Sequence, residues 1–273
     1  MPKEIKKTPV LIVLVLFLIF ANSNLMAFDL KQKWTGLAKE EKLKYTNIGA
    51  ALAITTWGFS TWAYGEKSPH AKSEGWFGED TKSGGADKLG HLYSSYVTDR
   101  ALTYLYESWG YSQDKAALYG AWSTFGLMSM MEVGDSVSSD YGFSYEDFII
   151  NGVGTYIGYA LETNPDLARK LDLRIEYMPG AKTDIFTDYE NTKYLVALKL
   201  DGFDSVQNKV LKHLELHLGY YSRGFDDDNA EKKRNIYVGV GLNLSKFFRD
   251  RNYHKTATFL NYYQVPNTDL QFK

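Results

Sequence analysis

The chain has 273 residues, 44% of them hydrophobic and 15% aromatic, which suffices for one large domain or two small domains with real cores. Its formal net charge is −2 with both signs interspersed, so the composition excludes electrostatic binding of nucleic acid as the basis of function. The sequence has no cysteine, which excludes disulfides and the attachment of a lipid at a cysteine that follows a signal peptide.

The N-terminus has the pattern of a secretory signal peptide. Lys3, Lys6 and Lys7 form a basic segment, residues 10–20 are an unbroken apolar run, and Ala27 offers a small-residue cleavage position. The apolar run is shorter than the roughly 20 residues of a membrane span, so an uncleaved anchor is the weaker alternative. We therefore predict a signal peptide at 1–27 and an exported protein, located in the periplasm and associated with the outer membrane or another envelope component.

Residues 28–170 have a helical pattern. Segments 48–64, 116–131 and 148–161 carry no charge, and segment 87–109 is apolar but interrupted by Lys88, Asp99, Arg100 and Glu107. Turn signals separate the four segments, which predicts an up-down bundle of about four apolar helices. Each run is shorter than a membrane span, so we expect a bundle in the periplasm rather than an integral membrane protein.

The periodicity changes to two beyond Asn164 and Pro165, in the region 171–273. Strict alternation of apolar and polar residues predicts antiparallel strands, with a weaker candidate at the end of the chain. The expected strands lie near 174–177, 194–200, 214–220, 236–244 and 256–264. The predicted fold class is therefore α+β, a helical bundle followed by an antiparallel sheet of four to five strands.

The alternation leaves two arrangements of the sheet open. Either the sheet lays its apolar face on the helices, or several chains complete an oligomeric outer-membrane β pore, because a single-chain pore needs about 8 strands. The first arrangement needs fewer assumptions, and we expect it. The opposite face then carries His213, Glu215 and His217, which zinc tolerates as ligands but which we expect to form an ordinary polar face.

Polar residues gather at helix ends. Residues four and seven apart share a helix face, which places His91 beside Asp87 and Asn151 beside Asp147 at the starts of the second and fourth helices. Glu132 and Asp135 end the third helix. In an up-down bundle these three helix ends lie together, so we expect all six side chains to meet in one polar site.

Such a site has two possible chemistries and several simpler explanations. One histidine with several carboxylates can bind a divalent metal ion or carry out acid–base catalysis. The candidate catalytic residues are His91, Glu132 and Asp147, and the candidate metal ligands are His91, Glu132 and Asp135. The supporting residues of the site are Asp87, Asp135 and Asn151. Alternatively, Asp87 only complements the helix dipole and Asp147 only completes a capping box with Ser144.

Three stretches resemble a known family. "DKLGH" at 87–91, "EVGDSVSSDYGFSYEDFIINGVGTYIGY" at 132–159 and "ETNPDL" at 162–167 are similar to the YfiM-like family of predicted periplasmic proteins of unknown function. The resemblance covers about 76–173, and a more distant one exists to the VanZ-like membrane family. It implies a periplasmic location but no activity, and it adds Lys88 to the supporting residues. Some relatives are lipoproteins, whereas this sequence lacks the required cysteine.

Three functions follow as hypotheses. We favour an exported cell-envelope protein that acts as a binding or structural component. The second hypothesis is a metal-assisted or acid–base hydrolase or transferase acting on an envelope lipid, phosphate or cell-wall substrate. The third is the oligomeric outer-membrane β pore. The sequence does not decide whether the protein is an enzyme.

Overall fold

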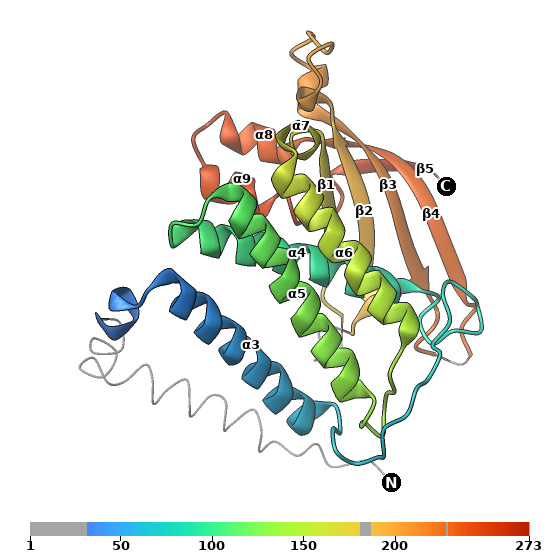
Figure 1. Cartoon of the computed structure of the whole chain (residues 1–273). Coiled ribbons are helices and arrows are strands. Elements are labelled where there is room, and N and C mark those ends of the chain that lie inside the picture. Colours follow the sequence, from blue (N-terminus) through green and yellow to red (C-terminus); the bar gives the residue numbers. More distant parts are fainter. Residues whose placement is uncertain (1–31, 181–186, 228, 273) are drawn as a thin grey trace.

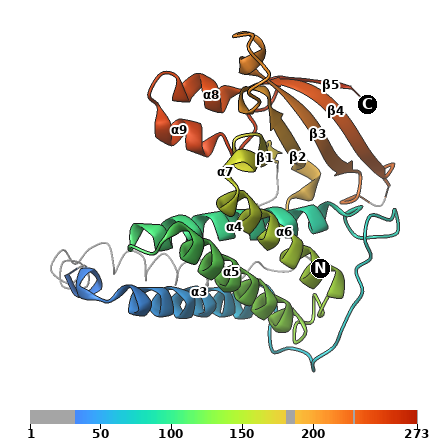
Figure 2. The ribbon, with the colours of Figure 1, turned by 45° about the horizontal axis from the view of Figure 1, so that its top comes forward.

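The computed structural model describes residues 32–180, 187–227 and 229–272, so the predicted signal peptide at 1–27 lies outside the described residues. Long helices occupy one half of the molecule, and a curved sheet lies over one side of them (Figures 1 and 2). The α+β class is confirmed.

The helical half consists of four long helices: α3 (Lys39–Thr61), α4 (Ala86–Ser108), α5 (Gln113–Asp135) and α6 (Tyr145–Thr163). The predicted segments are confirmed as helices. Helices α4, α5 and α6 pack on one another, whereas α3 lies beside α5 (Figure 1) and buries only Gly58. Among the residues that the structure describes, no helix combines the length and apolar character that crossing a membrane requires.

Small residues let the helices approach closely. A side chain at Gly154 would collide with the backbone of Leu92, and one at Gly158 would collide with Asp99. These glycines are therefore the reason why α6 can lie directly against α4. This contact fixes the distance between the polar residues at the two helix starts.

The sheet has five antiparallel strands in sequential order: β1 (Leu171–Tyr177), β2 (Thr192–Lys199), β3 (Leu214–Arg223), β4 (Lys233–Leu242) and β5 (Asp269–Phe272). Short helices α7 (Pro165–Ala168), α8 (Leu244–Arg249) and α9 (His254–Phe259) lie in the connections. The strand expected at 256–264 is wrong, because this segment begins as α9. The buried positions of the segment are Ala257, Leu260 and Gln264, three and four residues apart, which is a helical spacing.

The polar face of the sheet is enclosed, and its apolar face is more exposed than expected. Val196, Leu218, Val238 and Phe272 pair across four strands, and their side chains are 38%, 56%, 54% and 57% exposed. The row Lys199, Glu215, Gly241 and Asp269 belongs to the other face, and Lys199 and Glu215 are buried. The prediction that the apolar face lies on the helices therefore holds only in part: Tyr194 and Tyr220 of this face lie against the start of α4, whereas the aliphatic row stays exposed.

The end of the chain explains why the polar face is enclosed. The amide of Gln264 donates to the carbonyl of Ile175 in β1, and five residues later the chain begins to pair with β4 as strand β5. The segment between them thus connects both margins of the sheet across its polar face. Enclosed there, the charged side chains have one another as partners rather than water.

The enclosed face carries a continuous charged network. Arg174 lies 2.5 Å from Glu215 and 2.8 Å from Asp172, and the His217 ring lies 3.0 Å from Glu215 and 2.9 Å from Asp269. His213 is outside this network, because it belongs to a short 3-10 turn and lies 3.4 Å from Asp250. The sequence predicted an ordinary polar face that carries His213 and His217. The structure instead shows a buried charged network that contains His217 alone of these two histidines.

Candidate functional site

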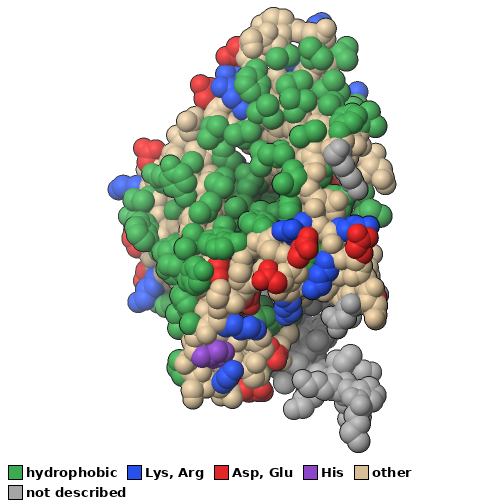
Figure 3. Space-filling model, turned by 90° about the vertical axis from the view of Figure 1, so that its right-hand side faces the viewer, with side chains coloured by type: hydrophobic (Ala, Val, Ile, Leu, Met, Phe, Trp, Pro, Cys, Tyr) green, Lys and Arg blue, Asp and Glu red, His purple; other side chains and the backbone are tan. Residues whose placement is uncertain are grey.

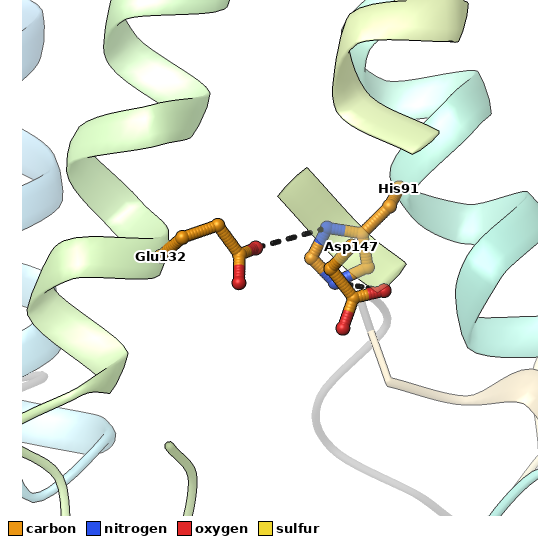
Figure 4. Close-up of side chains that lie close together, drawn as sticks. All are labelled: His91, Glu132 and Asp147. Atoms are coloured by element: carbon orange, nitrogen blue, oxygen red, sulfur yellow. Dashed lines mark ion pairs between the residues drawn. The ribbon is translucent and has the colours of Figure 1, made fainter. Parts of the chain in front are cut away.

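Three segments far apart in the sequence meet at one end of the bundle. His91 comes from the start of α4, Glu132 from the end of α5 and Asp147 from the start of α6, and Figure 4 shows the imidazole ring between the two carboxylates. Nδ1 of His91 lies 3.6 Å from Oε1 of Glu132, and Nε2 lies 3.9 Å from Oδ1 of Asp147. The structure therefore brings together the three residues that the sequence proposes as catalytic candidates.

Local sequence determines where α4 begins. Gly84 and Gly85 have φ angles of 64° and 86°, in the left-handed region that favours glycine. The helix starts directly after them, so Lys88 and His91 fall within its first two turns. Lys88 contacts Asp147 at the start of α6, and His91 lies beside Glu132 near the end of α5.

Ser144 determines where α6 begins. Its hydroxyl accepts a hydrogen bond from the backbone amide of Asp147 at 3.2 Å, which caps the helix. The Asp147 carboxylate does not return to the cap but contacts Lys88. The simpler explanation of Asp147 as part of a capping box is therefore wrong for its side chain.

Lys88 is a buried cation among three acids. Its Nζ lies 2.7 Å from Asp87, 2.9 Å from Asp147 and 3.2 Å from Glu74. Burial alone would lower the pKa of Lys88, but Asp87 and Asp147 outweigh it, and the pKa lies above its ordinary value. Burial raises the pKa of Glu74, although Lys88 opposes this shift. A single ammonium group thus faces three carboxyl groups.

The two acids of α5 have different environments. Burial, followed by the charges of Asp147 and Asp135, raises the pKa of Glu132 to about 9, so this side chain carries a proton at neutral pH. Burial also raises the pKa of Asp135, to about 6, against the lowering effect of a hydrogen bond with Tyr64. Asp135 therefore lies beside the aromatic ring that follows α3, at the margin of the site.

Asn151 connects the members of the site. Its Nδ2 donates to Glu132 at 3.3 Å, and its Oδ1 accepts a hydrogen bond from the hydroxyl of Ser95 at 2.9 Å. The same oxygen lies 3.3 Å from Nδ1 of His91. Asn151 is fully buried, so it fixes the relative positions of helices α4, α5 and α6 at this end of the bundle.

Within the described part of the chain, two groups of three side chains have ligand atoms within 4.8 Å of one another. One group is Glu74, Asp87 and Asp147, and the ammonium of Lys88 contacts all three of these acids. The other group is His91, Glu132 and Asp147, which has no ammonium group at its centre. Asp135, expected as a metal ligand, belongs to neither group, and Asp147 takes its place.

Sequence reasoning missed two residues. Glu74 lies in the loop before α4, and nothing in its local sequence indicates that its carboxylate reaches Lys88. Ser95 is fully buried and donates a hydrogen bond to Asn151. Its position in a helix rich in small side chains does not distinguish it from its neighbours in the sequence. Both contacts depend on tertiary packing.

Residues 73–163 match the family described as "Predicted periplasmic lipoprotein (DUF2279)", a domain of unknown function. The matched segment contains every residue of the site, from Glu74 to Asn151. The match covers about a third of the chain and supports an exported, periplasmic protein, and the YfiM-like and VanZ-like resemblances stay predictions. No curated protein and no solved structure matches the chain.

Proposed function

We propose that the protein is an exported component of the cell envelope that binds a divalent transition-metal ion through His91, Glu132 and Asp147. An imidazole and two carboxylates form a donor set suited to Zn²⁺, which catalytic sites hold with three protein ligands and one open position. Asn151 and Lys88 are the positioning residues of this site, since they hold Glu132 and Asp147.

The observation that carries the proposal is the spacing around His91. Its nitrogens lie 3.6 Å and 3.9 Å from the two carboxylates, too far for a good hydrogen bond. Ligands about 2.0–2.2 Å from a tetrahedral ion are about 3.3–3.6 Å from one another, close to these separations. Since an ion takes only one nitrogen of an imidazole ring, one carboxylate must rotate toward it on binding.

Charge also supports the proposal. Asp147 is 3% exposed, and although its Oδ1 lies 2.9 Å from Lys88, this oxygen accepts no hydrogen bond. The negative charges of Asp147 and Asp135 contribute to the high pKa of Glu132. A divalent cation would displace the proton of Glu132 and offset this excess of negative charge.

Titration calorimetry of the full chain with Zn²⁺, and separately with Mn²⁺, tests the proposal. We expect one ion per chain for the wild type and at least tenfold weaker binding for each of His91→Ala, Glu132→Gln and Asp147→Asn. His213→Ala is the matched control, because it removes an imidazole far from the site. Binding that survives all three substitutions, or no binding by the folded wild type, would refute the metal site.

A second candidate function uses the same residues without metal. Because Glu132 holds a proton at neutral pH beside His91, it has the protonation state of a general acid, as a hydrolase or transferase needs. Turnover of simple phosphate or acyl esters in the presence of a chelator, lost in Glu132→Gln, would favour this alternative. Loss of turnover on chelation would favour the metal.

A further inference from the structure

A hollow lies between the helices and the exposed face of the sheet. Its volume is about 710 Å³, within the range of about 300–1,000 Å³ that is typical of ligand sites. Leu89, Leu92 and Tyr93 of α4 and Ile157 of α6 line one side, and Val196 and Leu218 of the sheet line the other. We call this hollow the apolar groove.

The groove is the centre of a wider apolar surface. Figure 3 shows hydrophobic side chains on both sides of a hollow, with charged side chains gathered below them. On the sheet, the exposed row of Val196, Leu218, Val238 and Phe272 continues away from the groove toward the last strand. An apolar surface of this extent with a polar rim marks an interaction site.

We propose that this surface docks on a phospholipid bilayer and that the groove takes an acyl chain of that bilayer. The alternation in the sheet is the first argument. Charged residues such as Arg174 and Glu215 are enclosed and paired with one another, while the aliphatic row of Val196, Leu218 and Val238 points outward. This is the pattern of strands that face lipid, and it is unfavourable for a sheet face that stays in water.

The shape of the surface is the second argument. A second copy of the chain related by twofold symmetry presents the same hollow, so two such faces would leave the grooves unfilled. Flexible acyl chains can fill a hollow of this kind without leaving it empty.

The rim of the surface is the third argument. Arg234 lines the groove and pairs with Glu79, and such mixed charge complements zwitterionic phospholipid headgroups.

The absence of cysteine from the sequence makes a site-specific test possible. A nitroxide label is attached to single cysteines in Leu218→Cys, Val238→Cys and the control Val210→Cys, which replaces an exposed residue outside the strands and the groove. Full-length protein is mixed with vesicles of phosphatidylethanolamine and phosphatidylglycerol. Collisions with oxygen and with a water-soluble nickel complex are then measured by electron paramagnetic resonance.

We expect the labels at 218 and 238 to gain oxygen collisions and to lose nickel collisions several-fold on addition of vesicles, while the label at 210 does not change. The comparison of the three labels is specific to the apolar surface of the sheet. Insertion of the apolar run at 10–20 into the bilayer would not by itself bury the labels at 218 and 238. Labels at 218 and 238 that stay accessible to nickel would overturn the proposal. Labels that are buried before vesicles are added, together with a dimeric mass by light scattering, would also overturn it in favour of a second copy.

Discussion

Lys88 and Asp147 form a buried ion pair between α4 and α6, with 2.9 Å between Nζ and Oδ1 and side chains that are 0% and 4% exposed. This pair joins two of the three segments of the site. Removal of one partner leaves the other charge buried without compensation, which typically costs about 3–5 kcal/mol. We therefore expect Lys88→Met to lower the free energy of unfolding by about that amount, measured by urea denaturation at pH 7.

The double variant Lys88→Met with Asp147→Leu is the control for this prediction. Because it removes both charges, we expect it to be more stable than Lys88→Met alone. If the two substitutions instead destabilise additively, the two side chains do not interact as the structure shows.

The protonation state of Glu132 gives a second prediction. Since the pKa of this side chain is about 9, an amide resembles its form at neutral pH. We expect Glu132→Gln to change the free energy of unfolding at pH 7 by less than about 1 kcal/mol, whereas Glu132→Ala leaves a buried space and costs more. A larger loss for the glutamine variant than for the alanine variant would show that Glu132 is ionised in the folded protein.

Asp99 predicts how stability depends on pH. Burial, followed by the charge of Glu162, raises its pKa to about 8, and neither carboxylate oxygen has a hydrogen-bond partner. A carboxyl group with a raised pKa in the folded state favours folding below its ordinary pKa, and this contribution is lost as the pH rises toward about 8.

The variant Asp99→Asn cannot ionise, so we expect it to lose less stability than the wild type between pH 5 and pH 9. The difference at pH 9 should be at least about 1.4 kcal/mol, the equivalent of one pKa unit. Thermal unfolding across this pH range measures it. Parallel pH profiles for the wild type and the variant would mean that Asp99 is ionised throughout.

The enclosed network of the sheet predicts a contrast between two arginines. Arg174 is 2% exposed and contacts Glu215 and Asp172, whereas Arg169 pairs with the exposed Asp204. We expect Arg174→Leu to cost about 3–5 kcal/mol, because it leaves buried carboxylates unpaired, and Arg169→Leu to cost less than about 1 kcal/mol. Similar losses in chemical denaturation would contradict the burial of the network.

The sequence predicted the helices and strands more reliably than it predicted which of their faces are buried. The capped and glycine-flanked starts of α4 and α6 are local signals, and short links between apolar helices place His91, Glu132 and Asp147 at one end of the bundle. The antiparallel sheet was predicted correctly, but alternation assigns Leu218 and His217 to opposite faces without deciding which face is enclosed. The return of the chain through Gln264 decides this, and such a contact has no local signal.

The segment at 256–264 failed for a different reason. Its alternation of apolar and polar residues was weak, and Ala257 and Leu260 are three residues apart, which is a helical spacing. Asp135 was expected as a metal ligand because it shares the end of α5 with Glu132. Its place beside Tyr64 results from the chain that follows α3, which periodicity does not position.

Anomalous diffraction at the zinc absorption edge, from crystals of the full chain grown with Zn²⁺, tests the central claim most directly. We predict one strong peak about 2.0–2.2 Å from a ring nitrogen of His91 and from a carboxylate oxygen of each of Glu132 and Asp147. Crystals that show no peak among these three side chains, or that show the ion only on surface residues, would contradict the claim that they form a metal site.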